Sequence, residues 1–277
     1  MEKVQEYYDF IVPVVLEAGK IFKDVQEIEA ESKGEGKWDI VTIYDRKIED
    51  ILVNQIKNKY PDHKHIAEEE VSKTKNKKLE LTNSPTWIID PIDATANFVR
   101  RIPMICISIG FTINKEQVLG IVYNPYMDEL FTAIKGKGAF LNGQRIHTTN
   151  CTEIQKSLME YPIGVAAKKS LYNLYMYRFK HLMKNVAGIR AFGGAVLGQC
   201  YVACGKIDAY QCDGLYPWDA AAGTLIVKEA GGYVADSSGK EFDLMNPNFI
   251  VTATKELCDQ YLEVEKKADE ERTERVI

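Results

Sequence analysis

The sequence lacks a run of apolar residues long enough to cross a membrane. The apolar stretch at residues 11–16 falls well short of the roughly 20 residues that a spanning helix needs. The first six residues carry acidic side chains where a secretory signal peptide has bare positive charge. We therefore expect a cytoplasmic protein with no membrane partner.

The spacing of a disulfide framework and basic runs interleaved with aromatic residues are missing as well. The six cysteines are scattered along the chain, which suits a reducing compartment. Cys200 and Cys204 fall on one face of an expected helix, but small buried thiols explain this pair better than a zinc site does. The net charge is −5, and no run of Lys and Arg is interleaved with aromatic residues, which argues against nucleic acid as a partner.

The length of 277 residues suits one domain, residues 1–277, made of two lobes at about 1–145 and 146–277. Apolar periodicity and turn signals predict helices and an antiparallel meander in the first lobe, and mixed helices and strands in the second. The charged tail after Glu263 is predicted to be a frayed helix end. The predicted helices cover residues 4–25, 46–59, 172–185, 195–204 and 220–230, and the predicted strands cover 104–113, 117–124, 129–134, 139–141 and 209–212.

A short acidic turn at residues 90–95 is the most informative part of the sequence. The apolar residues 87–89 before it predict a buried strand, and Pro91 predicts a bend. Asp93 and Thr95 suit the capped start of a following helix, where free amides and the helix dipole attract phosphate. Two aspartates beside such a site suit the cations that phosphate transfer needs. A plain Asp-rich turn with a helix cap is the alternative.

Further acidic residues open or follow other predicted elements. These are Asp39, Asp45, Glu68, Glu69 and Asp219. Gathering several of them in one pocket is costly, because two unit charges about 4 Å apart repel by roughly 4 kcal/mol at an effective dielectric near 20. Divalent cations would offset this repulsion, and an all-oxygen ligand set favours two or more Mg²⁺ ions. Spacing alone does not decide whether these residues converge.

At these residues the sequence resembles the inositol monophosphatase family of Mg²⁺-dependent, lithium-sensitive phosphatases, and the resemblance covers nearly the whole chain. WIIDPIDATANF at residues 87–98 is similar to the family pattern W-[IV]-[IV]-D-P-[IL]-D-G-T-x-N-F. WDAAAG at 218–223, continuing to EAGG at 229–232, is similar to W-D-x-[AS]-A-x-x-x-[LIV]-x-x-E-x-G-G. Residues 39–45 fit D-x-V-T-x-x-D, and Glu68–Glu69 fits G-E-E with Ala67 in place of Gly.

The resemblance implies an α+β fold, the layered α-β-α-β-α sandwich of the inositol monophosphatase and fructose-1,6-bisphosphatase type. It also implies a homodimer, two or three Mg²⁺ ions and a small phosphorylated polyol as substrate. A Thr95–Asp45 pair would orient the attacking water, Glu68 and the metal would acidify it, and the amides of Ala94 and Thr95 would hold phosphate. The implied metal ligands are Glu68, Asp90, the Ile92 carbonyl, Asp93 and Asp219; the implied substrate residues are Asp93, Ala94, Thr95, Gly193, Gly194, Ala195, Asp213 and Asp219.

The sequence departs from the family pattern at the polyol end of the implied site. Ala94 replaces Gly, so a positive φ there would cost on the order of 1 kcal/mol. Gly194 replaces a commoner Thr, and Ala96 lacks a hydroxyl that many relatives carry. Inositol-selective relatives have an acidic residue where this chain has Cys212, which is either a core residue or a poor substitute; Asp213 could reach in if the strand shifts.

Three functions therefore stay open from the sequence. The first is a phosphatase for inositol monophosphate or a similar small polyol or sugar phosphate. The second is a phosphatase for nucleotide phosphates. The third is a catalytically weak paralogue that binds metal or sugar phosphate as a regulatory protein.

Overall fold

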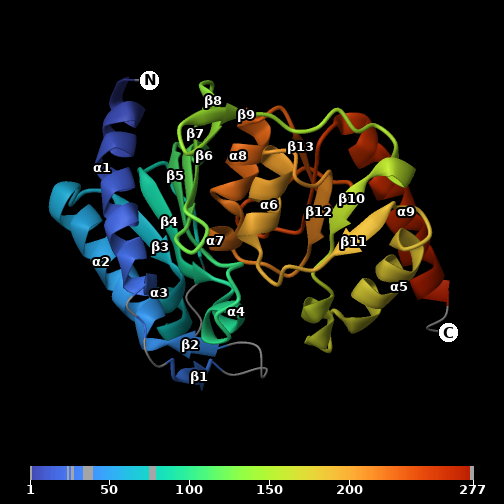
Figure 1. The fold of residues 1–277 in the computed structure, drawn as a ribbon, viewed down its shortest axis with the longest axis horizontal. Helices are drawn as coiled ribbons and strands as arrows, with labels where there is room; N and C mark the ends of the chain where they lie inside the picture. The colour runs from blue at the N-terminus through green and yellow to red at the C-terminus, as the bar shows by residue number, and fades with distance from the viewer. Residues whose placement is uncertain (1, 24, 26–27, 34–39, 75–78, 275–277) are drawn as a thin grey trace.

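The computed structural model describes residues 2–23, 25, 28–33, 40–74 and 79–274. Two large β-sheets and three layers of helices alternate through the molecule, as Figure 1 shows, and a third, two-stranded sheet lies beside them. This confirms the α-β-α-β-α sandwich predicted from the resemblance. Within the described residues, no helix is long and apolar enough to cross a membrane. Asp39 lies outside the described residues.

The larger sheet has seven strands in the order β3-β4-β5-β6-β7-β8-β9. The pair β3 and β4 is parallel, and every later pair is antiparallel, so the predicted meander is confirmed. Every residue of β4 is buried, which places the acidic turn at its end inside the molecule. The strands are β3 Lys64–Ala67, β4 Thr86–Asp93, β5 Cys106–Ile113, β6 Glu116–Asn124, β7 Glu129–Ile134, β8 Gly138–Leu141 and β9 Gln144–Ile146.

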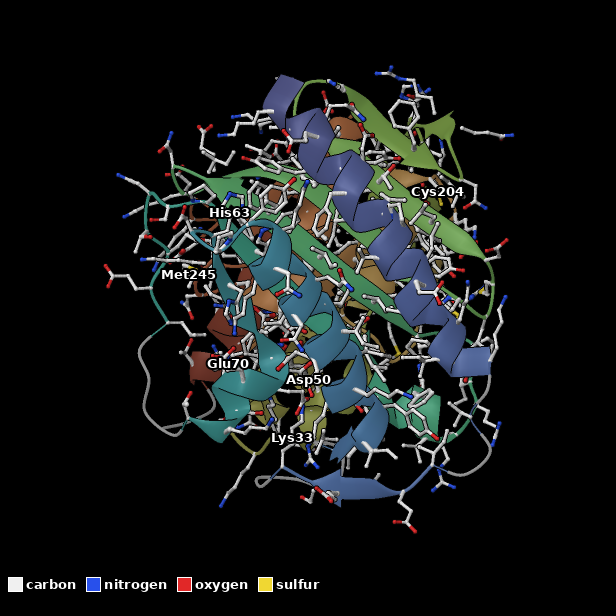
Figure 2. All side chains as sticks on the ribbon, turned by 90° about the vertical axis from the view of Figure 1, so that its left-hand side faces the viewer. Lys33, Asp50, His63, Glu70, Cys204 and Met245 are labelled. Atoms are coloured by element: carbon white, nitrogen blue, oxygen red, sulfur yellow. The ribbon has the colours of Figure 1, made fainter. Side chains whose placement is uncertain are left out.

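Helices α1 (Glu2–Gly19) and α2 (Ile43–Lys59) cover the outer face of this sheet (Figure 2). Their apolar faces pack into one core cluster with the strands. The helix predicted over residues 4–25 ends at Gly19 and is followed by the 3₁₀ turn Lys20–Lys23, η1. A short hairpin, β1 (Ala30–Ser32) and β2 (Ile40–Thr42), leads into α2.

The middle layer holds α6 (Val196–Ala203), α7 (Pro217–Ala220) and α8 (Gly223–Glu229). Two glycines of the larger sheet let this layer approach closely. A Cβ at Gly110 would lie 2.4 Å from the Ala221 Cβ, and one at Gly120 would lie 2.7 Å from the Ala222 carbonyl oxygen. The helix predicted over residues 220–230 is therefore found as α7 and α8, with the two alanines between them seated against the sheet.

The smaller sheet has five strands in the order β11-β10-β12-β14-β13. Strand β10 is parallel to β11 and β12, and the other pairs are antiparallel. The sequence analysis predicted only β12 among these strands. The strands are β10 Leu158–Glu160, β11 Gly188–Arg190, β12 Ala209–Cys212, β13 Tyr233–Asp236 and β14 Phe249–Thr252.

Helices α5 (Tyr172–Leu182) and α9 (Lys255–Glu274) form the outer layer on the smaller sheet. The prediction of a frayed end after Glu263 is wrong, because α9 continues to Glu274 with Glu265 and Ala268 fully buried. Arg178 of α5 forms ion pairs with Glu265 and Asp269, which hold the C-terminal half of α9 against α5. The larger sheet lies within residues 64–146 and the smaller within 158–252. The division into two lobes near residue 145 stays a prediction.

Candidate active site

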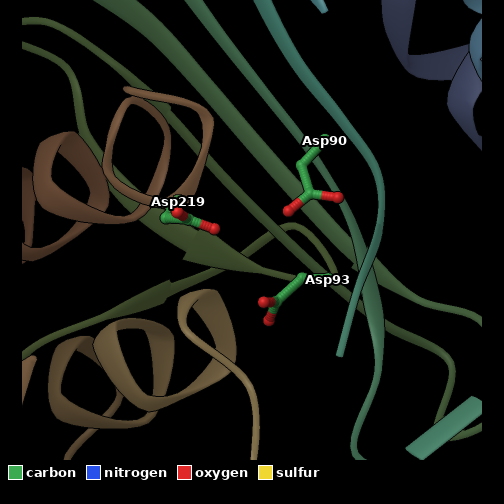
Figure 3. Close-up of side chains that lie close together, drawn as sticks. All are labelled: Asp90, Asp93 and Asp219. Atoms are coloured by element: carbon green, nitrogen blue, oxygen red, sulfur yellow. The ribbon is translucent and has the colours of Figure 1, made fainter. Parts of the chain in front are cut away.

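Three aspartates converge where the larger sheet meets the middle layer of helices. Asp90 and Asp93 come from the end of β4, and Asp219 comes from α7, which packs on β4. One carboxylate oxygen of each residue lies within 4.8 Å of those of the other two. Figure 3 shows the three carboxylates pointing toward a common space. Residues 129 positions apart in the sequence thus form one acidic cluster.

Burial and mutual repulsion make this cluster unfavourable without cations. Burial raises the pKa of Asp90 well above its usual range, and the neighbouring charges of Glu68, Asp93 and Asp219 raise it further. Burial likewise raises the pKa of Asp93 and of Asp219. An all-oxygen set of buried carboxylates fits a hard divalent cation such as Mg²⁺, whose charge would offset the repulsion. The residues present therefore fit the implied metal.

Glu68 reaches the same site from the first position of α3 (Glu68–Lys73), directly after β3. Lys33 Nζ lies 2.7 Å from Glu68 Oε1 and 2.5 Å from Glu69 Oε1. Burial raises the pKa of Glu68 to about 7, although Lys33 opposes the rise. The sequence analysis missed Lys33, because nothing in its local pattern shows which carboxylates it meets 35 residues away. Ala67 has φ −124°, so the Gly of the family pattern is not needed there.

Thr95 and Asp45 form the hydrogen bond that the resemblance implied. The Thr95 hydroxyl has Asp45 Oδ1 at 3.0 Å and the Ile92 carbonyl oxygen at 3.1 Å as acceptors. Asp45 is fully buried, and its Oδ2 accepts hydrogen bonds from the amide and hydroxyl of Thr42. The Asp45 side chain is thereby fixed with one oxygen facing Thr95.

The capping prediction for Asp93 and Thr95 is wrong. Helix α4 (Thr95–Val99) begins after Ala94, and its N-cap has no side-chain hydrogen bond. Asp93 instead accepts hydrogen bonds from the amides of Ala195 at 2.8 Å and Val196 at 3.0 Å, so it caps α6. A carboxylate at a helix N-terminus is stabilised by these amides and by the helix dipole. Asp93 thereby joins the turn after β4 to the loop before α6.

The two departures from the family pattern at positions 94 and 194 lie next to each other in space. Ala94 has φ 67° and ψ 49°, the left-handed conformation that the sequence analysis considered. A Cβ at Gly194 would lie 3.2 Å from the Ala94 Cβ and 2.7 Å from Asp93 Oδ2. The Ala94 methyl therefore fills space next to a position that tolerates no side chain without movement of Asp93.

A cavity of about 480 Å³ joins the acidic cluster to the loop before α6. Asp45 is not among its lining residues and lies behind Thr95. Cys212 lines the cavity and is 1% exposed, so it belongs to both the core and the cavity wall. The predicted site residues that line the cavity are Glu68, Asp90, Ile92, Asp93, Ala94, Thr95, Gly193, Gly194, Ala195 and Asp219.

The prediction that Asp213 contacts substrate is not supported by its position. The side chain is buried outside the cavity lining, with Arg178 Nη1 3.1 Å from its Oδ2. Ser237 and Gln211 also donate hydrogen bonds to this carboxylate. Adjacent residues of an extended chain point in opposite directions, so Cys212 faces the cavity and Asp213 faces away from it.

Comparisons with known proteins agree with this geometry. The model of the "Inositol monophosphatase family" matches residues 3–270. The chain belongs to the inositol monophosphatase family. Inositol monophosphatase 3 of Solanum lycopersicum is 42% identical over 87% of this chain and 90% of its own. The chain is accordingly a phosphoric monoester hydrolase of the inositol-phosphate phosphatase type.

Solved structures of inositol monophosphatase relatives have the same fold. The Thermotoga maritima IMPase is 31% identical, with a TM-score of 0.81 over 96% of this chain and 99% of its own. An IMPase/NADP phosphatase complexed with Mg²⁺ and phosphate is 23% identical, with a TM-score of 0.81 over 95% of each chain. At that identity the second likeness shows the fold alone.

Proposed function

We propose that this protein hydrolyses inositol monophosphate or a similar small polyol phosphate by attack of a metal-activated water, with Mg²⁺ as its cofactor. The observation that carries this proposal is the convergence of Asp90, Asp93 and Asp219 beside a Thr95 hydroxyl that is bonded to Asp45. The all-oxygen donor set of buried carboxylates supports the choice of metal. Glu68, Asp90, the Ile92 carbonyl, Asp93 and Asp219 would hold two or three ions.

Bound Mg²⁺ would supply charge that stabilises the phosphoryl oxygens and acidifies water. Thr95 donates a hydrogen bond to Asp45 or to the Ile92 carbonyl, so its oxygen can accept a hydrogen bond from the attacking water and orient it. Glu68 lines the same cavity, and its carboxylate would take up the one proton that the attacking water loses. The amides of Ala94 and Thr95 would hold the phosphate oxygens at the start of α4.

The experiment that tests this proposal is steady-state phosphate release against Mg²⁺ concentration. The substrates are inositol 1-phosphate, 2′-AMP and glycerol 2-phosphate. We expect Mg²⁺-stimulated release from the polyol esters, and loss of that release in Asp93→Asn. Asp259→Asn is the matched control, because Asp259 lies exposed on α9 and pairs only with Lys255 in the described structure.

Other outcomes would contradict the proposal. Release from 2′-AMP alone would make the protein a nucleotide phosphatase. Mg²⁺ binding by calorimetry without turnover of any ester would support a regulatory binding protein instead.

We also propose that the protein is a cytoplasmic homodimer inhibited by lithium, as its family resemblance implies. The exposed apolar side chains Tyr172, Met176 and Met183 on and beside α5 support a contact with a second copy. Light scattering after size-exclusion chromatography would test the dimer. Phosphate release at rising Li⁺ and fixed Mg²⁺ would test the inhibition.

A further inference from the structure

The loop before α6, residues 191–195, forms part of the cavity lining through Ala191, Gly193, Gly194 and Ala195. These residues carry a methyl group or no side chain, so the loop presents mainly its backbone to the cavity. Gly193 has φ 88°, a conformation that favours glycine, and the chain turns there. The shape of this part of the cavity therefore depends on where neighbouring groups hold the loop backbone.

Side chains from both large sheets hold this loop by hydrogen bonds. Asp93 of β4 accepts from two amides at the end of the loop, as described above. Asn97 Nδ2, from α4, donates to the Phe192 carbonyl at 2.7 Å. The Tyr210 hydroxyl, from β12, donates to the Gly194 carbonyl at 3.2 Å. The loop is thus fixed at several backbone groups by residues far from it in the sequence.

Glu160, the last residue of β10, makes a further contact with this loop. Its side chain is fully buried, and its Oε1 accepts a hydrogen bond from the Phe192 amide at 3.1 Å. Its Oε2 has no hydrogen-bond partner among the described residues. Burying a carboxyl with one oxygen unpaired is costly, and an apolar side chain would avoid that cost. The bond to Phe192 is therefore what this carboxyl adds to the structure.

The packing around Glu160 leaves room for a carboxyl group. A Cβ at Gly198 of α6 would collide with Glu160 Oε2 and would lie 2.9 Å from Tyr210 Cγ. Burial raises the pKa of Glu160 well above its usual range, although the Phe192 amide opposes the rise. The carboxyl is then protonated near neutral pH, so glutamine has the matching shape and charge.

We propose that Glu160 is a positioning residue that holds the loop before α6 where its backbone binds the alcohol part of the substrate. This inference rests on the proposed phosphatase function. Glu160 is not among the residues that line the cavity, so it acts through the Phe192 amide. The phosphate group is proposed to lie elsewhere, at the acidic cluster and the amides of Ala94 and Thr95, so phosphate binding should not depend on Glu160.

Steady-state kinetics of two variants at position 160 test this inference. Glu160→Val removes the acceptor and should raise KM for inositol 1-phosphate about fivefold, the effect of one lost hydrogen bond, with little change in kcat. The inhibition constant of inorganic phosphate should stay unchanged. Glu160→Gln keeps an oxygen that can accept from the Phe192 amide, and its KM should stay close to that of the unmodified protein.

Met159→Ala is the matched control for a loss of stability. Met159 precedes Glu160 on β10, is fully buried, and belongs to the core cluster beneath α5 and α9. Neighbouring residues of a strand point to opposite faces, so this variant should lower the melting temperature without changing KM.

Gly198→Ala displaces the Glu160 carboxyl by a second route, which keeps the inference testable if Glu160→Val does not fold. We expect it to raise KM for inositol 1-phosphate without changing the inhibition constant of inorganic phosphate. Combined with Glu160→Val, it should cause little further rise, because the carboxyl it displaces is already absent. Equal effects of Gly198→Ala in both backgrounds, or an unchanged KM in Gly198→Ala alone, would overturn the inference.

The remaining outcomes distinguish this inference from the proposed function. If Mg²⁺ stimulates no phosphate release by the unmodified protein from inositol 1-phosphate, 2′-AMP or glycerol 2-phosphate, the phosphatase proposal and the inference both fail. If release occurs but Glu160→Val keeps its KM, the inference alone is overturned. The same holds if Met159→Ala raises KM equally, or if Glu160→Gln raises it as much as Glu160→Val.

Discussion

Replacing Arg178 with methionine should strongly destabilise the second lobe. The Arg178 side chain is 3% exposed, and its guanidinium lies 3.1 Å from Asp213, 3.0 Å from Glu265 and 2.8 Å from Asp269. It therefore joins three segments: α5, the chain that follows β12, and α9. Methionine fills a similar volume of apolar stem but leaves the buried carboxylates without their cation.

The expected magnitude follows from the burial of the partners. The Asp213 side chain is 6% exposed, so solvent cannot replace the lost cation. Removing one partner of a buried ion pair typically costs about 3–5 kcal/mol in the free energy of unfolding. For a chain of this size, about 2 °C per kcal/mol gives a melting temperature lower by roughly 6–10 °C.

Urea unfolding followed by circular dichroism measures this loss. The control is Lys267→Gln on α9, which breaks a 61% exposed ion pair with Glu263 and should cost less than about 0.5 kcal/mol. Adding Asp213→Asn to Arg178→Met should restore part of the stability, because it removes a buried charge. A loss below about 1 kcal/mol in Arg178→Met would refute the reasoning.

Three further predictions concern pH, metal binding and turnover. Burial raises the pKa of Glu265 to about 8 from an ordinary value of 4.5, so the folded state keeps a proton that the unfolded state loses, and stability should fall as pH rises from about 4.5 to 8. The free energy of unfolding, measured in urea across this pH range, should fall less steeply in Glu265→Gln than in the unmodified protein. In Glu263→Gln it should fall as steeply as in the unmodified protein, and equal slopes in the two variants would contradict the assignment of the retained proton to Glu265. Gly194→Ala should push the Asp93 carboxylate from its place and raise the Mg²⁺ concentration for half-maximal activity by roughly 10- to 100-fold, the equivalent of about 1–3 kcal/mol of overpacking. Adding Ala94→Gly should recover part of this loss, and strictly additive effects would mean that the two positions do not interact. Thr95→Val should lower kcat by about 10²- to 10⁴-fold with little change in KM, while Thr95→Ser should restore most of it; a change in KM alone would argue against a role in orienting water.

Local sequence patterns predicted the parts of the site that depend on residues close to one another in the sequence. The apolar run before Asp90 gave β4 and its position, because continuous apolar residues bounded by turn residues are typical of a buried strand. The metal-ligand candidates and the Thr95–Asp45 pair followed from motif residues, and the structure brings these side chains together. Their roles in metal binding and turnover stay predictions.

Other features depend on contacts between distant segments, and the sequence did not contain a local signal for them. Asp93 could have capped the helix that follows it, but it accepts hydrogen bonds from amides at the start of α6, about a hundred residues later in the sequence. Asp213 was expected in the cavity, but it turns to Arg178, because a buried carboxylate needs a cation and the nearest one comes from α5. The tail after Glu263 looked too charged to pack, yet Arg178 also neutralises its buried face.

The sequence by itself thus determined the family, the layered fold and the acidic residues from which the site is built. Strand and helix periodicity and motif spacing act over a few residues, so they can be seen without coordinates. Only the tertiary structure decided which charges face one another: Lys33 lies beside Glu68 and Glu69, and Arg178 lies beside Asp213. Electrostatic and packing energies depend on distance in space, which the order of residues along the chain does not specify.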